Sequence, residues 1–200
     1  MVRCNVRLNM KFITIAASCM ILVAGCNGPP TPRLSVIEYL KDHNYSQEVI
    51  DAAINGEKLP KDLIIKISTS WNIDAAHQIA TNPTLTSEEI ELFVNSMFDF
   101  VRAGVARNTN LSQTQIDKLF KDSSPMVNSY LARNPAVPEA LLIRLRNEKK
   151  IGLFDFAVNP HCPEIIKEEI RKSNDDLAKK WLENTNQKKA NQAEEHDTAR

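Results

Sequence analysis

The stretch that decides the fold is Leu131-Ala132-Arg133-Asn134-Pro135-Ala136-Val137. Three similar stretches occur at 79–85, 105–111 and 156–162, each with an apolar, a small and a variable residue before an asparagine. The four asparagines are spaced 26, 26 and 25 residues apart and are Asn82, Asn108, Asn134 and Asn159. Self-similarity at a fixed period of this size is the sequence signature of a repeat architecture.

Apolar columns accompany the motif on both sides. Around Asn82 they hold Ala75, Ile79, Ile90 and Phe93, which lie seven and three residues before the asparagine and eight and eleven residues after it. Residues three or four apart share one face of a helix. Two weaker copies flank the four clear ones, and they place Asn55, Leu177, Trp181 and Asn184 in the corresponding columns.

Each repeat therefore predicts two short amphipathic helices joined by a tight turn. In three of the four turns an Asn-Pro pair disfavours helical geometry at the asparagine and stops the preceding helix. Helices of this length are marginal alone in water and are stabilised by stacking on neighbours. We expect an all-α domain over 34–186, an α-solenoid of short helical-hairpin repeats of about 26 residues.

The motifs Val105-Ala106-Arg107-Asn108 and Leu131-Ala132-Arg133-Asn134-Pro135, followed by leucine-like positions at helical spacing, resemble the leucine-rich repeat variant family. The resemblance spans about 45–186 and implies alternating short helices, some of them 3₁₀, in a right-handed superhelix. It also implies an interaction scaffold with no shared catalytic residues. The period here is longer than the family's, and Thr109 replaces a proline, so a HEAT-like pairing of two ordinary α-helices is equally acceptable.

The N-terminal segment is typical of a targeting signal. A basic start with Arg3, Arg7 and Lys11 precedes the apolar run 12–24, which is shorter than the roughly 18 to 20 residues of a membrane span. Val23-Ala24-Gly25-Cys26 then resembles the bacterial lipobox. That resemblance implies a signal peptide over 1–25, removed by cleavage, and a lipid on Cys26.

Two acyl chains or more hold a protein on a membrane stably. The proline-rich segment 26–33 predicts a tether of only about 20 Å. Asn27 after the cysteine favours, by analogy with enteric bacteria, the periplasmic side of the outer membrane over the inner membrane, with the cell surface also possible. The alternatives are a plain secreted protein with a chance cysteine and a translation start at Met10 instead of Met1.

Composition excludes several function classes. The 25 basic and 25 acidic side chains balance, which disfavours a nucleic-acid partner. The 5 glycines are scattered, so no glycine-rich phosphate-binding loop is present. Cys162 has no cysteine partner left after processing and falls in an apolar column, where we expect core packing. The four histidines, His43, His77, His161 and His196, never stand at ligand spacing, so we expect no metal and no cofactor.

The candidate binding residues are Arg107 and Arg133, which recur at one position of the repeat. If that position is exposed, the two arginines line one edge about one repeat apart and can bind an acidic partner. The alternative is that each arginine is solvated or caps carbonyl groups near its helix C-terminus, where the helix dipole favours a cation. The segment 187–200 has no apolar residue larger than alanine and is predicted to be a disordered tail.

The sequence thus predicts a lipid-anchored protein, not an enzyme, whose helical repeats bind another protein of the bacterial cell envelope. One alternative is an envelope enzyme or enzyme subunit, which would gather His77 or His161 with acids in a deep pocket. The other is a module that binds cell-wall polysaccharide, which would show exposed aromatic side chains along a groove.

Overall fold

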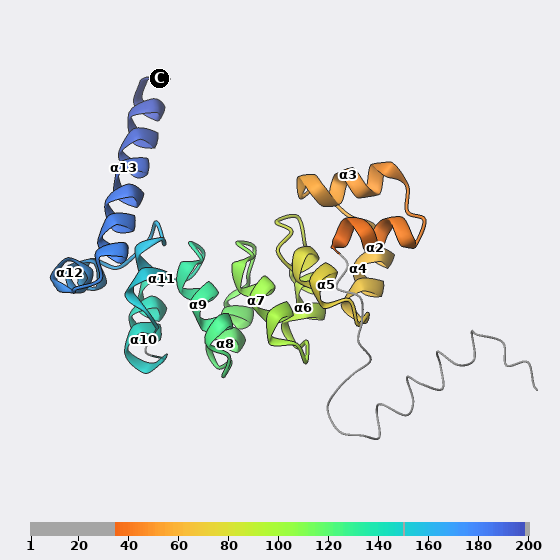
Figure 1. The fold of residues 1–200 in the computed structure, drawn as a ribbon, viewed down its shortest axis with the longest axis horizontal. Coiled ribbons are helices and arrows are strands. Elements are labelled where there is room, and N and C mark those ends of the chain that lie inside the picture. Colours follow the sequence, from red (N-terminus) through yellow and green to blue (C-terminus); the bar gives the residue numbers. More distant parts are fainter. Residues whose placement is uncertain (1–34, 150, 199–200) are drawn as a thin grey trace, which may run out of the picture. The chain divides into compact units, whose positions relative to one another are not determined.

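The computed structural model describes residues 35–149 and 151–198, with side chains described for 35–148 and 151–187. Within these ranges the regular structure consists of 12 α-helices, without strands (Figure 1). The predicted all-α class is therefore confirmed. The predicted signal peptide 1–25, Cys26 and the tether 26–33 lie outside the described residues, so the predictions made for them stay predictions.

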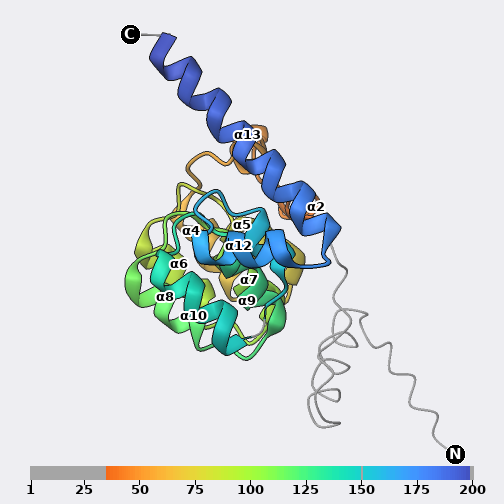
Figure 2. The same cartoon turned by 90° about the vertical axis from the view of Figure 1, so that its left-hand side faces the viewer.

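The helices pack in sequential pairs that form two layers. In the first layer each helix contacts the following helix of the same layer. The order is α2 (Val36–Asp42), α5 (Ile73–Ala80), α7 (Asp99–Arg107), α9 (Pro125–Arg133), α11 (Leu153–Ala157) and α13 (Asp176–Thr198). The second layer holds α4 (Lys61–Ser68), α6 (Ser87–Val94), α8 (Gln113–Phe120), α10 (Glu139–Lys149) and α12 (Glu164–Lys172). In the end-on view of Figure 2, α6, α8 and α10 lie on one side and α7 and α9 on the other.

The apolar columns of the repeat form the core between the two layers. Burial of these side chains provides most of the free energy that holds such short helices in place. The buried column residues are Ala75, Ile79, Ile90, Phe93, Val101, Val105, Ile116, Leu119, Val127, Leu131, Leu142, Leu145, Phe156 and Ile170. Cys162 is only 4% exposed and packs in this core, as predicted from its column.

Local sequence sets the helix ends. Thr86 with Glu89 and Ser112 with Gln115 form reciprocal capping boxes that start α6 and α8. At the other helix of the repeat, Asn134 ends α9 in an extended conformation (φ −78°, ψ 121°). Asn108 ends α7 in nearly the same conformation (φ −68°, ψ 130°), although Thr109 follows it in place of proline. The turn geometry therefore does not depend on that proline.

Three buried asparagines form a series of hydrogen bonds between successive first-layer helices, which we call the asparagine ladder: Asn108, Asn134 and Asn159. Nδ2 of Asn134 donates to the carbonyl oxygens of Ala106 (2.8 Å) and Asn108 (2.7 Å) in the preceding repeat. Its Oδ1 accepts from the backbone N–H of Ala136 (2.8 Å). Asn108 and Asn159 make the corresponding three bonds. Each ladder residue thereby satisfies carbonyl groups at a helix end, which have no partner within their own helix.

The C-terminal flanking copy is shifted by one residue from its predicted register. Leu177 and Trp181, expected in core columns, are 56% and 40% exposed, whereas Ala178 and Leu182 are buried. Thr185, not the exposed Asn184, takes the ladder position, and its Oγ1 donates to the Ala157 carbonyl at 3.0 Å. In this register α13 packs on α11 with Ala178 and Leu182 buried, while Trp181 lies at the surface and meets Phe154 edge to face.

The N-terminal flanking copy also differs from its prediction. Asn55 is exposed at the end of α3 (Gln47–Asn55), and its amide approaches only Glu57. The first-layer helix that packs on the N-terminal side of α5 is α2, which precedes the predicted copy, and α3 lies against α2. The N–H of Val36 donates to the side chain of Gln78 (3.3 Å) across the α2–α5 contact.

In the described part of the chain no helix is both long enough and apolar enough to cross a membrane. The longest helix, α13, continues to Thr198, into the segment 187–200 for which the sequence predicts a disordered tail. The disorder expected for that segment stays a prediction.

Candidate partner-binding site

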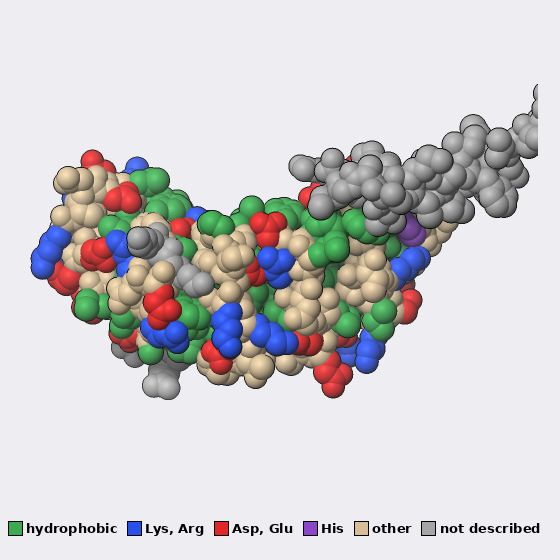
Figure 3. Space-filling view, turned by 90° about the horizontal axis from the view of Figure 1, so that it is seen from below, with side chains coloured by type: hydrophobic (Ala, Val, Ile, Leu, Met, Phe, Trp, Pro, Cys, Tyr) green, Lys and Arg blue, Asp and Glu red, His purple; other side chains and the backbone are tan. Residues whose placement is uncertain are grey.

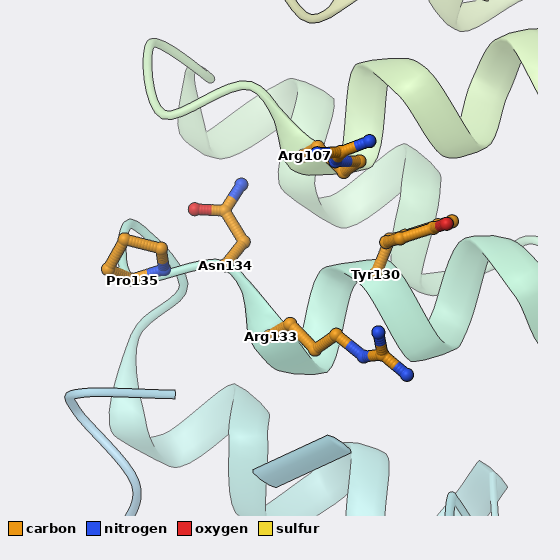
Figure 4. Close-up of a pocket in the computed structure, with 5 residues that line it drawn as sticks. All are labelled: Arg107, Tyr130, Arg133, Asn134 and Pro135. Atoms are coloured by element: carbon orange, nitrogen blue, oxygen red, sulfur yellow. The ribbon is translucent and has the colours of Figure 1, made fainter. Parts of the chain in front are cut away.

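The two candidate arginines occupy equivalent positions on neighbouring helices. Arg107 is the last residue of α7 and Arg133 the last residue of α9. Tyr130, one turn before Arg133, lies between them (Figure 4), with the two guanidinium carbons 5.4 Å and 5.5 Å from its ring centroid. A guanidinium group at this distance is attracted by the negative face of an aromatic ring.

The alternation of arginine and aromatic ring continues along the first layer. The guanidinium of Arg133 also lies over Phe154 of α11, 5.3 Å from its centroid. Phe154 in turn meets Trp181 of α13 edge to face, with centroids 6.0 Å apart. We call Arg107, Tyr130, Arg133, Phe154 and Trp181 the arginine–aromatic row. It crosses α7, α9, α11 and α13 and ends on a tryptophan that is 40% exposed.

A buried carboxylate fixes one arginine of the row. Asp155 on α11 is mostly buried, and its Oδ1 accepts from Nε of Arg133 (2.7 Å) and from the hydroxyl of Ser129 (2.7 Å). Nη2 of Arg133 is 2.5 Å from the same oxygen. Arg133 is thus held in place by an ion pair and two aromatic rings, and it makes no carbonyl-capping bond within the described residues.

Arg107 differs from Arg133 in having no acidic partner. It is exposed, and among the described residues no acceptor bonds its guanidinium. The nearby titratable group is His77, whose Nδ1 donates to the Phe100 carbonyl at 2.7 Å and whose ring stacks on that of Phe100. Burial lowers the pKa of His77, the hydrogen bond to Phe100 opposes this, and the charge of Arg107 lowers the pKa further.

A hollow of about 400 Å³ opens beside the two arginines and is lined by Arg107, Tyr130, Arg133, Asn134 and Pro135. The side chain of Asn134 is committed to the asparagine ladder. The guanidinium of Arg107 and the hydroxyl of Tyr130 therefore remain as the groups a ligand can bind. Guanidinium groups bind carboxylates through two parallel hydrogen bonds, so the chemistry of this hollow suits an acidic group.

Of the other residues considered in the sequence, His161 lies beside the hollow and Cys162 lies in the core. His161 is exposed, and its Nδ1 donates to the Pro135 carbonyl at 2.9 Å. Burial raises the pKa of the Cys162 thiol to about 11, which keeps it protonated and unreactive near neutral pH. Among the residues that the structure describes, no three His, Cys, Asp or Glu side chains gather as metal ligands.

The sequence pointed to the two arginines but missed the aromatic members of the row. Tyr130 could have been found, because it stands three residues before Arg133 and therefore on the same face of α9. Trp181 could not, because the apparent repeat register placed it in the core. Nothing in the sequence marks Phe154 as a surface residue of the row, since the repeat pattern identifies only Phe156, two residues later, as the core residue.

No known protein-family model matches the chain, and no curated protein or solved structure matches it either.

Proposed function

We propose that this protein is a lipid-anchored component of the bacterial cell envelope whose helical domain is an interaction scaffold and not an enzyme. In this proposal the domain is an α-solenoid with repeats of about 26 residues, and Cys26 carries the lipid. The arginine–aromatic row is the surface that binds a partner protein. A short tether keeps that surface close to the outer membrane on its periplasmic side.

The proposal of a solenoid is supported by the asparagine ladder. Its rungs join equivalent atoms of successive helices, with bonds spanning 28 residues from Asn108 to Ala80 and again from Asn134 to Ala106. A stack held by such nearest-neighbour contacts grows in one dimension and exposes extended surfaces, which is the feature that scaffolds of this kind use for binding.

The single observation that carries the binding proposal is the state of Arg107. Its guanidinium is exposed, oriented over Tyr130 and without an acidic partner among the described residues, whereas Arg133 beside it is paired. An oriented arginine and an aromatic ring on a surface are typical of binding hot spots between proteins.

The sugar-binding alternative is less well supported by the geometry. Stacking of a sugar needs a free aromatic face, but both neighbours of Tyr130 in the row are guanidinium groups that lie over its ring (Figure 4). Phe154 is likewise covered by Arg133 and met by Trp181. Of the row's rings, Trp181 has the largest exposure on which a sugar could stack.

A crosslinking experiment in cells tests the scaffold proposal. The tagged wild-type protein is crosslinked and captured from membranes beside the double variant Arg107→Glu with Arg133→Glu. We expect a discrete envelope protein with the wild type and its loss with the variant. The matched control makes the same charge change in the second layer, at exposed Lys121 and Arg144. Retention of the partner by the row variant would contradict the surface assignment, and capture of cell-wall polymer alone would favour the sugar-binding alternative.

The anchor is tested separately through Cys26→Ser. We expect this variant to incorporate no radiolabelled palmitate and to accumulate uncleaved or in soluble fractions. Cys19→Ser, within the expected signal peptide, is the control and keeps the wild-type behaviour. Complete processing and membrane attachment of the Cys26 variant would contradict the lipobox interpretation.

A further inference from the structure

The arginine–aromatic row has two chemically different ends. At one end, Arg107, Tyr130 and Arg133 line the polar hollow of about 400 Å³. At the other end, Phe154 and Trp181 meet edge to face, and the indole is 40% exposed. A ligand that covers the whole row must therefore present an acidic group at one end and an apolar group at the other.

The charge of the row favours an acidic ligand. Asp155 neutralises Arg133, and its carboxylate is already occupied by that guanidinium and by Ser129. Arg107 has no such partner among the described residues. One unpaired guanidinium thus remains, and a carboxylate bound by it would be partly shielded from water beside Tyr130.

The length of the row favours an extended chain. The successive contacts from the guanidinium of Arg107 to the ring of Trp181 are 5.4, 5.5, 5.3 and 6.0 Å long, so the two ends of the row lie at most about 22 Å apart. An extended polypeptide advances about 3.3 Å per residue. A peptide segment of about six residues therefore spans the distance between the arginine hollow and Trp181.

A membrane surface suits this row less well than a peptide does. Binding to anionic lipid requires clusters of about four to eight basic residues, whereas the row contributes one unpaired arginine. On the face of the molecule seen in Figure 3, basic and acidic side chains are interspersed.

We infer that the arginine–aromatic row binds an extended acidic segment of its partner protein, with a carboxylate at Arg107 and an aromatic or aliphatic side chain about six residues away at Trp181. This inference rests on the proposed scaffold function, to which it adds the chemistry and the length of the partner segment. The carboxylate provides the charge contact and the apolar side chain fixes the segment along the row.

Selection from a random peptide library on the purified full-length chain in detergent tests the inference. We expect enriched peptides to carry an aspartate or glutamate with an aromatic or aliphatic residue about six positions away. Fluorescence anisotropy of an enriched peptide then measures its affinity. Arg107→Gln should weaken binding at least about tenfold, as expected when a hydrogen bond to a charged group is lost, and Trp181→Ala should weaken it severalfold.

Matched residues outside the row provide the controls. Arg144 lies over the ring of Phe120 on the second layer at 4.4 Å, so Arg144→Gln removes a similar arginine and should leave the affinity unchanged. Trp71 is 41% exposed and meets Phe98 edge to face, so Trp71→Ala is the control for Trp181→Ala. Circular dichroism confirms that each variant keeps its helical content.

Three results would overturn the inference: enrichment of no peptide, enrichment of peptides without acidic residues, and equal binding by the Arg107→Gln variant. Displacement of the enriched peptide by short-chain phosphatidylglycerol, but not by short-chain phosphatidylcholine, would assign the hollow to a lipid headgroup instead. If the row variant loses its partner in cells while acidic peptides fail to bind, the scaffold proposal stands and only the acidic segment is wrong.

Discussion

Asparagine is required in the ladder because of the bonds that its side chain makes. Nδ2 of Asn134 supplies two donors to carbonyl groups of the preceding repeat, and Oδ1 accepts from Ala136 in its own turn. Aspartate has no donor and serine has only one, so neither can make all three bonds. Glutamine has the same polar group but is one methylene longer. The three ladder asparagines are at most 2% exposed, so each missing bond leaves a polar group without water.

Asn134→Ala is expected to destabilise the fold by about 2–3 kcal/mol, because it leaves two carbonyls and one N–H buried without a partner. The free energy of unfolding from urea titration measures the loss. Asn174→Ala is the control, since Asn174 is exposed and has no hydrogen bond within the described residues. It should change stability by less than about 0.5 kcal/mol. Equal effects of the two substitutions would rule out a structural role for the ladder.

His77 makes stability depend on pH. Its pKa in the folded protein is lowered, chiefly by burial, below the value of about 6.5 in an unfolded chain. The fold therefore favours the neutral ring. The stabilisation is fully present above pH about 6.5 and is lost as the pH falls through the lowered pKa of the folded state. We expect the urea midpoint of the wild type to fall more steeply from pH 7 to pH 5 than that of His77→Gln.

The exposed His161 provides the control for this measurement. His161→Gln makes the same substitution at an exposed position and is measured beside His77→Gln. A His77→Gln variant whose midpoint falls as steeply as the wild type's would assign the acid sensitivity to other groups.

At the scale of elements, the spacing of α5 and α7 depends on Gly104. A Cβ atom at this position would lie 2.6 Å from the backbone oxygen of His77 and 3.3 Å from Cβ of Ala80. The backbone of α5 cannot move away without also displacing its bonds to the neighbouring helices. The two helices therefore approach closely only because residue 104 has no side chain, and this approach brings His77 against Phe100.

Gly104→Ala is expected to destabilise the fold by about 1–3 kcal/mol through overpacking, despite the better helix propensity of alanine. Thermal unfolding followed by circular dichroism measures the effect. Gly152→Ala is the control, because its added Cβ would meet only Asp155 Oδ2 at 3.8 Å. It should cost less than about 1 kcal/mol, since Gly152 caps α11 without a side-chain bond. A neutral Gly104→Ala would show that α5 and α7 are not closely packed in solution.

At the scale of the whole molecule, each inner first-layer helix packs on the one before it and the one after it. The second layer adds further contacts between neighbouring repeats, such as the ion pair between Arg146 of α10 and Glu169 of α12. Stability in such a stack is a sum over neighbouring units, so an end can open while the middle stays folded.

Leu40→Ala in α2 and Leu131→Ala in α9 test this behaviour, because both leucines are fully buried. Each loses about 2–5 kcal/mol of packing. We expect Leu40→Ala to speed hydrogen exchange in α2, α3 and α5 and to leave α11 and α12 protected, whereas Leu131→Ala should speed exchange in helices on both sides of α9. Leu177→Ala is the control, because Leu177 is exposed, and it should change the hydrogen exchange rates little. Uniform acceleration by Leu40→Ala would show that the domain unfolds as one unit.

The sequence by itself determined the helical class, the paired helices and most of the core. These features follow from local physics, because column spacing, capping residues and Asn-containing turns act over a few residues. It also placed Arg107 and Arg133 at one position of the repeat. The lipid anchor at Cys26, the partner and the cellular location remain predictions at this stage.

Only the tertiary structure decided the rest. Whether Trp181 or Leu182 faces the core depends on how α13 packs on α11, and in the structure Leu182 is the buried residue. Asp155 pairs with Arg133 and leaves Arg107 without an acid within the described residues, because only the former arginine faces the carboxylate on α11. Contacts between repeats join residues more than twenty positions apart, and a periodic pattern fixes the spacing of such residues but not which side chains meet.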